Sequence, residues 1–385
     1  MHFFEVLHLI YLDNAATTGQ KPMSVIKAVN NALINYNFNP GRSGYSNSLK
    51  TAEEVYKCRK ALKDFFNATS ENNVCFTYNC TQAINMVLNG VLNKGDHIII
   101  SSLEHNAVFR PINYLHKEKG IEFDIANVDL ISDEITIKNI EKHIKKNTKM
   151  IFLTAASNVL GRKLPITRIG ELCKSKNILF GVDAAQLAGK ANIDMQRCYI
   201  DYLCIAPHKS FYAPTGLGVL IAEKSIDNVI ISGGTGVNSI QPFQPNDFPE
   251  RIESGTQNIP AILGLKAGVE FVKNKTLRKI EAHEIVLVQH LYKSLKKINA
   301  ELYTIYPEQK MFAPVLSFNI KGFTSEEVGE ILNKNNIAVR TGLHCAPLAH
   351  KQLKTLERGT VRVSTSLFNN YDDIDRLIFC LKRII

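Results

Sequence analysis

The chain has 385 residues, of which 45% are hydrophobic and 21% are charged. These fractions are close to the average of folded water-soluble proteins, so they exclude a disordered, collagen-like or coiled-coil chain. The length exceeds that of one ordinary core, and we expect a large domain over residues 11–262 and a smaller one over residues 263–385. Residues 1–10 lack a basic stretch, and we expect this short extension to pack on the body.

No apolar run approaches the roughly 18 residues that would span a bilayer, so we expect no membrane segment. The eight cysteines include no Cys-x-x-Cys pair, which argues against a disulfide framework or a zinc site, and we expect no bound metal. Scattered thiols of this kind are typical of a reducing cytoplasm. The formal net charge is +10, but lysines spread as in residues 142–149 indicate a solvated surface rather than a nucleic-acid site.

Segments rich in β-branched residues alternate with amphipathic segments from about residue 74 to 222. The strands predicted there are Val74–Thr77, His97–Ser101, Met150–Thr154, Ile178–Val182, Tyr202–Ala206 and Gly218–Ile221. This alternation is typical of an α/β domain with a mostly parallel sheet. Such sheets bind ligands where the strands end. The candidate site therefore comprises residues 79–82, 104–106, 158, 183–186 and 208–209.

The remainder of the chain predicts loops and then a second domain. Residues 232–260 are rich in Pro and Gly with aromatic and charged residues among them, which favours active-site loops over a linker. One long helix is predicted over residues 261–295. The smaller domain has α+β character, with strands predicted at Val315–Ile320, Ala338–Thr341 and Thr360–Ser364 and a closing helix from Asp372.

The segment Ile205-Ala-Pro-His-Lys-Ser-Phe-Tyr-Ala-Pro-Thr-Gly-Leu-Gly-Val219 places a lysine just past a buried strand. The amine of Lys209 can be desolvated there and form a Schiff base, although it could also be one more surface lysine. Asp183 ends another apolar strand, where a buried carboxylate needs a cationic partner such as a protonated pyridine nitrogen. Asp183 could equally be the N-cap of a following helix.

Phosphate binding needs backbone donors at a helix start together with hydroxyl groups. The segment Tyr78-Asn-Cys-Thr-Gln-Ala-Ile84 predicts a strand, a turn and a helix with Thr81 in its first turn, where Thr81 is a phosphate ligand or a cap. Glu104-His105-Asn106 follows another strand. The imidazole of His105 could lie flat on a ring, although a single histidine is more often structural.

In the smaller domain, Val339-Arg-Thr-Gly-Leu-His-Cys-Ala-Pro347 sets Cys345 in a loop near an arginine and a histidine. Positive neighbours favour the thiolate, the reactive form of cysteine, whereas an isolated loop cysteine is usually inert. Arg362 lies in a predicted strand, where its guanidinium suits a bidentate grip on a substrate carboxylate or an ordinary ion pair.

Together these motifs resemble the class V aminotransferases, pyridoxal-phosphate enzymes of fold type I, and among them the cysteine desulfurases. The resemblance runs from Tyr11 to the C-terminus and includes the motif Tyr11-Leu-Asp-Asn-Ala-Ala-Thr-Thr18. Four further motifs follow in the family's order, namely Glu-His-Asn, Asp-Ala-Ala-Gln, His-Lys and Arg-Thr-Gly-Leu-His-Cys-Ala. Arg340, six or fewer residues before Cys345, resembles the Suf-type (group II) branch.

The resemblance implies an enzyme that converts L-cysteine to L-alanine and holds the sulfur as a persulfide on Cys345 for an acceptor protein. It implies that Lys209 forms a Schiff base with pyridoxal 5'-phosphate and removes the Cα proton. The implied ligands of the ring are Asp183 at its nitrogen, Gln186 at its phenolic oxygen and His105 stacked on its face. The implied substrate ligands are Asn158 and Arg362, with Arg340 close by.

The resemblance also implies that Thr81, His208 and a neighbouring subunit's Thr256 hold the cofactor phosphate, and hence a homodimer. Two positions depart from the family's pattern. Cys80 stands in the phosphate loop where Thr is common, and Ala206 stands where Ser or Thr is usual. Two hydroxyl contacts are therefore missing, and we expect weaker cofactor binding or compensation by backbone donors.

Three alternatives remain open on the sequence. The nearest is a selenocysteine lyase or another pyridoxal-phosphate-dependent β-elimination enzyme of the same family. A tRNA-associated sulfur donor would suit the positive charge, but the chain contains no recognised RNA-binding module. A scaffold without catalysis is disfavoured because Lys209, Asp183 and Cys345 are all present.

Overall fold

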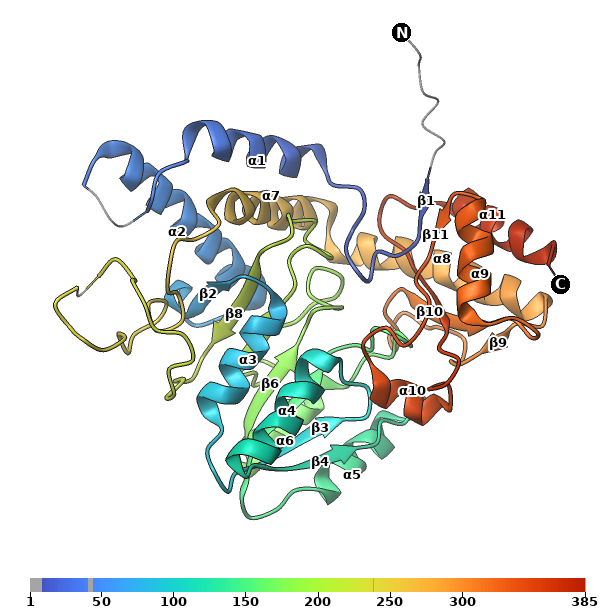
Figure 1. The fold of residues 1–385 in the computed structure, drawn as a ribbon, viewed down its shortest axis with the longest axis horizontal. Coiled ribbons are helices and arrows are strands. Elements are labelled where there is room, and N and C mark those ends of the chain that lie inside the picture. The colour runs from blue at the N-terminus through green and yellow to red at the C-terminus, as the bar shows by residue number, and fades with distance from the viewer. Residues whose placement is uncertain (1–8, 41–43, 238, 385) are drawn as a thin grey trace, which may run out of the picture. The chain divides into compact units, whose positions relative to one another are not determined.

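The computed structural model describes residues 9–40, 44–237 and 239–384 (Figure 1). They form two compact units, each assembled from separate stretches of the chain. The larger unit comprises Lys21–Ala155 and Pro165–Leu277, and the smaller comprises the described residues of Met1–Gln20, Ala156–Leu164 and Arg278–Ile385.

The units divide at residue 277 rather than at the expected residue 262. The reason is helix α7 (Ile259–Lys275), which packs against α1 (Met23–Asn35) and α2 (Ser46–Phe66) and therefore belongs to the larger unit. Of the N-terminal extension, residues 1–8 lie outside the described residues.

A seven-stranded sheet forms the centre of the larger unit, in the order β2-β8-β7-β6-β5-β3-β4. Its strands are β2 (Val74–Thr77), β3 (His97–Ser101), β4 (Glu122–Ala126), β5 (Thr148–Thr154), β6 (Leu179–Asp183), β7 (Tyr202–Ile205) and β8 (Gly218–Ala222). Only β8 runs antiparallel to its neighbours, so the sheet is mostly parallel as predicted. The six predicted strands are present within two residues at each end. Strand β4 was not predicted because its half-exposed, polar edge sequence has no apolar run.

The sheet is buried between helices, which explains the continuous apolar runs of its inner strands. Besides α1, α2 and α7, the helical elements of this unit are η1 (Glu71–Asn73), α3 (Cys80–Val91), α4 (Asn106–Lys119), α5 (Asp133–Lys142) and α6 (Ile166–Lys176). Helices α3 and α4 lie side by side (Figure 1). Both begin directly after strands, so their first residues lie at the carboxyl edge of the sheet.

The smaller unit contains two small sheets and four helices. Its strands are β1 (Ile10–Tyr11) paired with β11 (Ile337–Ala338), and β9 (Glu301–Leu302), β10 (Val315–Asn319) and β12 (Val361–Ser364) in an antiparallel sheet. Its helices are α8 (Leu277–Lys297), α9 (Ser325–Lys334), α10 (Pro347–Leu353) and α11 (Tyr371–Lys382). Ile10 and Leu12 are buried in its hydrophobic core.

Two predicted elements were wrong in detail. The single helix over residues 261–295 is broken into α7 and α8 at Thr276, whose φ of +66° is incompatible with a helix. The strand predicted at residues 338–341 is shorter. After β11 the backbone of Arg340 pairs with that of Arg362 as an isolated bridge. Gly342 exchanges backbone hydrogen bonds with Thr360 and turns the chain at a φ of +91°.

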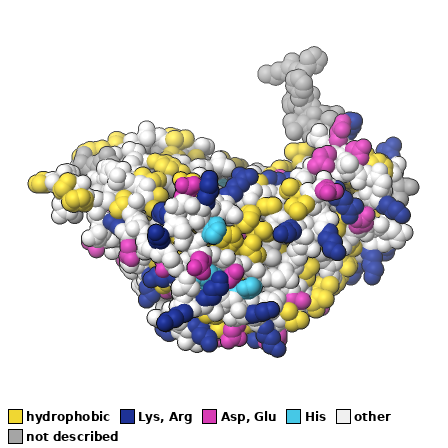
Figure 2. All heavy atoms as spheres, turned by 60° about the horizontal axis from the view of Figure 1, so that its bottom comes forward, with side chains coloured by type: hydrophobic (Ala, Val, Ile, Leu, Met, Phe, Trp, Pro, Cys, Tyr) yellow, Lys and Arg dark blue, Asp and Glu magenta, His cyan; other side chains and the backbone are white. Residues whose placement is uncertain are grey.

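Within the described part of the chain, no helix combines the length and the apolar character needed to cross a membrane. Figure 2 shows Lys and Arg side chains mixed with Asp and Glu over the face it presents, rather than gathered in one basic patch.

Candidate active site

The turn between β2 and α3 places Cys80 and Thr81 at the start of a helix. The side chain of Asn79 is the N-cap, accepting a hydrogen bond from the backbone N–H of Gln82 at 2.9 Å. The cap role considered for Thr81 is therefore filled by Asn79, and Thr81 is exposed in the first turn. Backbone N–H groups at a helix start attract anions, so this turn suits a phosphate group.

Asp183 is a buried carboxylate at the carboxyl end of β6. Its Oδ1 accepts a hydrogen bond from the N–H of Ala185 at 2.9 Å and from the Cys80 thiol at 3.8 Å. Burial raises the pKa of Asp183, against the lowering effects of the Ala185 bond, the Lys209 charge and the Cys80 thiol. The next element after β6 is a strand, so the N-cap alternative for Asp183 was wrong. A cationic ligand would stabilise this carboxylate.

Lys209 lies in a tight turn after β7. Its N–H donates to the carbonyl of Ala206 at 3.1 Å, and its own carbonyl accepts from the N–H of Tyr212 at 3.1 Å. Burial raises the pKa values of Asp183 and Cys80, and the charge of Lys209 acts in the opposite direction on both. The structure thus brings together Lys209, Asp183 and Cys80 from three separate segments.

His208 is kept neutral beside Lys209. Burial lowers the pKa of His208 to about 4, and the charges of Lys209 and Lys21 act in the same direction. The ammonium of Lys21 donates to the backbone carbonyl of His208 at 3.2 Å, and burial lowers the pKa of Lys21 to about 8. Lys21 was not among the predicted site residues, because its sequence context does not distinguish it from the other lysines of the chain.

His105 is the N-cap of α4, where its Nδ1 accepts a hydrogen bond from the N–H of Ala107 at 3.0 Å. This bond holds the neutral ring in the tautomer that carries its proton on Nε2. The structural role considered for His105 is therefore present, and it fixes the orientation of the ring at the edge of the sheet. Gln186 is buried three residues after Asp183.

Glu104 of the predicted site is a second buried acid, and the sequence did not reveal its complete burial. Its Oε1 accepts hydrogen bonds from the Ser101 hydroxyl and from the N–H of Thr154 at 2.9 Å, whereas Oε2 is buried without a partner among the described residues. Burial raises the pKa of Glu104 to about 8, and the charge of Asp183 acts in the same direction. The available signal was an acid shortly after an apolar strand, as for Asp183.

These features of the larger unit fit pyridoxal phosphate. Asp183 offers a buried negative charge to a protonated ring nitrogen, and the start of α3 offers N–H groups to a phosphate. Ser210, next to Lys209, has a buried hydroxyl that makes no hydrogen bond with the described residues. Within those residues no cluster of three or more His, Cys, Asp or Glu could hold a metal ion.

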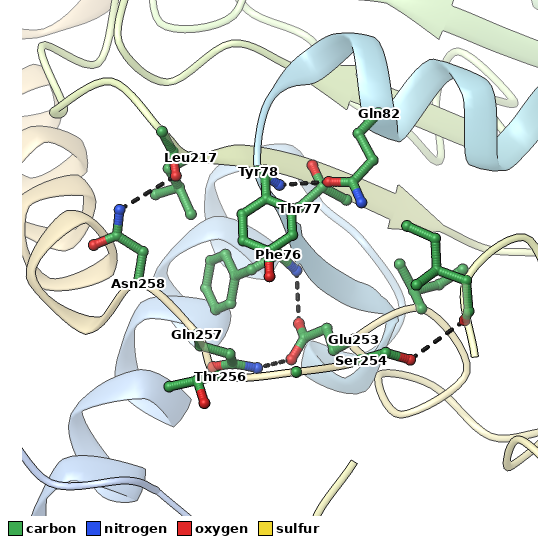
Figure 3. A pocket seen from close by; sticks show the side chains of 14 residues that line it. Phe76, Thr77, Tyr78, Gln82, Leu217, Glu253, Ser254, Thr256, Gln257 and Asn258 are labelled. Carbon is green, nitrogen blue, oxygen red and sulfur yellow. Dashed lines mark hydrogen bonds between the residues drawn. The ribbon is translucent and has the colours of Figure 1, made fainter. Parts of the chain in front are cut away.

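Thr256 lies in the exposed segment before α7. It lines a pocket together with Thr77, Tyr78 and Gln82, which end β2 and begin α3 (Figure 3). A Cβ atom added to Gly255 would lie 3.5 Å from the Tyr78 hydroxyl oxygen, which shows how closely the two segments approach. Thr256 and the start of α3 are thus neighbours within one unit.

In the smaller unit the structure brings together Asn158 and two arginines. The backbones of Arg340 and Arg362 pair as antiparallel neighbours, with hydrogen bonds of 3.3 and 2.7 Å. Arg362 is buried; its guanidinium binds the Asp13 carboxylate and the carbonyl of Asn158, the latter at 3.1 Å. Its Nε has no acceptor among the described residues. Burial lowers the pKa of Arg362, while Asp13 raises it.

Cys345 is exposed, whereas Cys80 is partly exposed and the other six cysteines are buried. Its Sγ lies 3.6 Å from Nη2 of Arg340. His344 and Cys345 both have left-handed backbone, with φ of +50° and +57°, which side chains other than glycine adopt at a cost. The amide of Asn158 holds this loop by donating to the His344 carbonyl at 2.7 Å.

Two neutral histidines support the loop from inside the unit. Nε2 of His344 lies 3.1 Å from the Thr360 carbonyl oxygen and 3.0 Å from its hydroxyl oxygen, within hydrogen-bond distance of both. Nδ1 of His350 forms a hydrogen bond with the Thr355 hydroxyl at 2.8 Å. Their ring centres are 5.6 Å apart. Burial lowers the pKa of His344 to about 2 and that of His350 to about 4. Sequence reasoning did not identify this pair.

Known proteins resemble the chain over most of its length. The family model described as aminotransferase class V matches residues 10–377. Probable cysteine desulfurases from Borreliella burgdorferi and Pyrococcus abyssi are each 31% identical to the chain, over 99% and 98% of it and 93% and 94% of their own lengths. The solved apo cysteine desulfurase of Thermococcus onnurineus has a TM-score of 0.90 at 29% identity, covering 98% of this chain and 94% of its own. One from Escherichia coli has a TM-score of 0.86 at 25% identity, covering 97% and 94%. The predicted α/β fold with a mostly parallel sheet is therefore confirmed.

Proposed function

Because the chain belongs to the class V aminotransferase family, we propose that it is a cysteine desulfurase, as its relatives are named, and that it depends on pyridoxal phosphate. It would convert L-cysteine to L-alanine and keep the sulfur as a persulfide on Cys345 for transfer to an acceptor protein. One observation carries the proposal: an exposed thiol lies 3.6 Å from Arg340, whose backbone partner Arg362 is suited to bind a substrate carboxylate.

Pyridoxal phosphate, when bound, supplies an electron sink for the negative charge left on the substrate Cα after its proton is removed. Asp183 would bind the ring nitrogen and keep it protonated. Gln186 would donate to the phenolic oxygen, and His105, oriented by its cap bond, would lie on the ring face. Asp183 ends β6, and Gln186 and His105 come shortly after β6 and β3, at the edge where such sheets bind ligands.

The phosphate would be held at the start of α3 by Cys80 and Thr81, by His208, and by the partner subunit's Thr256, so we propose a homodimer. His208 would serve as a neutral hydrogen-bonding group, because its pKa is lowered to about 4. The amine of Lys209 would hold the cofactor covalently and, once released, remove the substrate Cα proton.

The substrate carboxylate would bind Arg362 and Asn158, with Arg340 close by. Arg340 and Arg362 occupy directly opposite positions of an antiparallel pair, where like charges repel. Asp13 neutralises only one of the two charges. A carboxylate bound here would relieve the remaining repulsion and find a free donor at Nε of Arg362.

Sulfur transfer would then use the Cys345 thiolate as a nucleophile. It attacks the sulfur of the bound L-cysteine, so that an S–S bond forms while the substrate C–S bond breaks. The electron pair of that bond stays on the substrate Cβ, which takes up a proton and becomes the methyl group of alanine. The alanine then leaves the site. The positive charge of Arg340 would stabilise the attacking thiolate.

The test is an assay of the purified, cofactor-loaded protein for alanine and for persulfide on the enzyme after addition of L-cysteine. The Cys345→Ser variant should keep its cofactor absorbance and form no persulfide. The control Cys380→Ser carries the same change at a buried cysteine of α11 and should behave as the wild type. A colourless wild-type protein, or persulfide on Cys345→Ser, would disprove the proposal. The rates of alanine formation from L-cysteine and from L-selenocysteine distinguish the lyase alternative, which predicts that selenocysteine is consumed in preference when both are supplied.

A further inference from the structure

A buried ion pair outside the proposed reaction site joins Arg59 of α2 to Glu253. The two groups meet through two parallel hydrogen bonds, Nη1–Oε1 at 2.7 Å and Nη2–Oε2 at 2.6 Å. Their side chains are only 9% and 6% exposed. Such bidentate geometry fixes the orientation of both groups, because the planar guanidinium matches the carboxylate at two points.

Each partner also contacts β2, the strand at one edge of the sheet. Arg59 donates to the Val74 carbonyl, and its guanidinium lies 4.6 Å from the centre of the Phe76 ring. Glu253 accepts a hydrogen bond from the N–H of Phe76 at 2.6 Å (Figure 3). The pair therefore ties the segment that contains Glu253 to β2, the strand that leads into the proposed phosphate-binding turn.

The same carboxylate holds the chain on the far side of Thr256. Glu253 also accepts from the side-chain amide of Gln257, so bonds to one carboxylate connect residues on both sides of Gly255 and Thr256 (Figure 3). Asn258 continues the constraint by donating to the Gly216 carbonyl at 3.3 Å and capping α7. Thr256 itself is exposed in the pocket beside Tyr78.

We propose that Arg59 and Glu253 are positioning residues that hold the Thr256 hydroxyl of their own chain ready to bind the cofactor phosphate in the other subunit of the homodimer. This inference rests on the proposed function, in which Thr256 is a phosphate ligand across the dimer. A desolvated ion pair is a costly way merely to attach a loop, since apolar contacts of the same size would stabilise it as well. A need to fix the backbone around Thr256 explains two features: the two parallel hydrogen bonds between Arg59 and Glu253, and the further bond that the same carboxylate accepts from Gln257.

The test measures dissociation constants of the cofactor-free protein for pyridoxal phosphate and for pyridoxal, which lacks the phosphate. Loss of one hydrogen bond predicts that Thr256→Val weakens pyridoxal phosphate binding about tenfold. Glu253→Gln and Arg59→Lys should each weaken it by a similar factor, because both break the pair of parallel hydrogen bonds while keeping the polar contacts largely filled. The double variant Glu253→Gln/Thr256→Val should bind no more than about threefold worse than Thr256→Val alone. Pyridoxal affinity should stay within about twofold in all of them.

A pair that only stabilises the fold predicts a different result. The losses in the double variant would then multiply to about a hundredfold, or pyridoxal binding would fall together with that of pyridoxal phosphate, and either outcome would overturn the proposal. Glu54→Gln is the matched control, because it breaks another α2 ion pair, to Lys266, that does not contact this segment. It should leave both affinities unchanged. If Glu253→Gln fails to fold, Arg59→Lys replaces it, both as the single variant and in the double variant with Thr256→Val.

Failure of the proposed function would appear separately. A wild-type protein that binds neither compound removes the function and the inference together. A wild-type protein that binds pyridoxal phosphate and forms alanine, while its Glu253→Gln variant binds pyridoxal phosphate equally well, removes the positioning role alone.

Discussion

Replacing Glu104 with Gln tests whether the acid at the edge of the sheet is protonated in the folded protein. Burial raises the pKa of Glu104 from 4.5 to about 8. Between these pH values the folded chain keeps a proton that the unfolded chain has released, so the free energy of unfolding falls as pH rises through this window. The difference between the two pKa values corresponds to about 5 kcal/mol over the whole window.

Glutamine cannot ionise, and its carbonyl oxygen can still accept from the Thr154 N–H. The unfolding free energy of Glu104→Gln, relative to the wild type, should therefore rise by up to about 5 kcal/mol from pH 4.5 to pH 8 and then level off. Urea unfolding of both cofactor-free proteins at pH 5, 6, 7 and 8 measures this difference. A constant difference, or one that falls with pH, would show that Glu104 is already ionised when folded and would refute the reasoning.

Three further changes test the site. Lys209→Ala should retain no cofactor after borohydride reduction and form alanine at least about a hundredfold more slowly; wild-type turnover in the alanine assay would contradict this. Cys80→Thr restores a hydroxyl at the start of α3 and should tighten cofactor binding about fivefold, as equilibrium dialysis would show; unchanged or weaker binding argues against phosphate contact there. His350→Leu should become more stable relative to the wild type by about 2 kcal/mol as pH falls from 6.5 to 5, because the pKa of about 4 for folded His350 lies below that of the unfolded chain. Urea unfolding at both pH values measures this change, and a pH-independent difference would be inconsistent with it.

Much of the larger unit could be predicted because its inner strands are buried on both faces. Such strands are continuous apolar runs; Asp183 is the last residue of one of them, and Lys209 comes soon after another. Strand β4 at the sheet edge has no such run and was missed. The break at Thr276 was missed as well, because apolar residues at helical spacing continue from α7 into α8 while the backbone does not.

The residues that the sequence could not reveal act through partners far away in the chain. Arg59 and Glu253 are 194 residues apart, and Lys21 binds a carbonyl 187 residues away. Neither local spacing nor strand position carries information about such pairs. Glu104 is different, because its position after an apolar strand was visible and only its complete burial was not.

Asn158 is a predicted site residue whose position in the fold the sequence did not indicate. Its place after β5 suggested the edge of the large sheet, yet residues 156–164 belong to the smaller unit. They are held there by the N–H of Lys163 bonding to Met311 at 2.8 Å, and by the N–H of Ala313 bonding to Gly161 at 2.7 Å. Gly161 permits this approach, because a Cβ atom there would lie 2.6 Å from the Ala313 carbonyl oxygen. The glycine three residues after Asn158 thus allows the short excursion that brings the Asn158 amide to the His344 carbonyl, next to the cysteine proposed to carry sulfur.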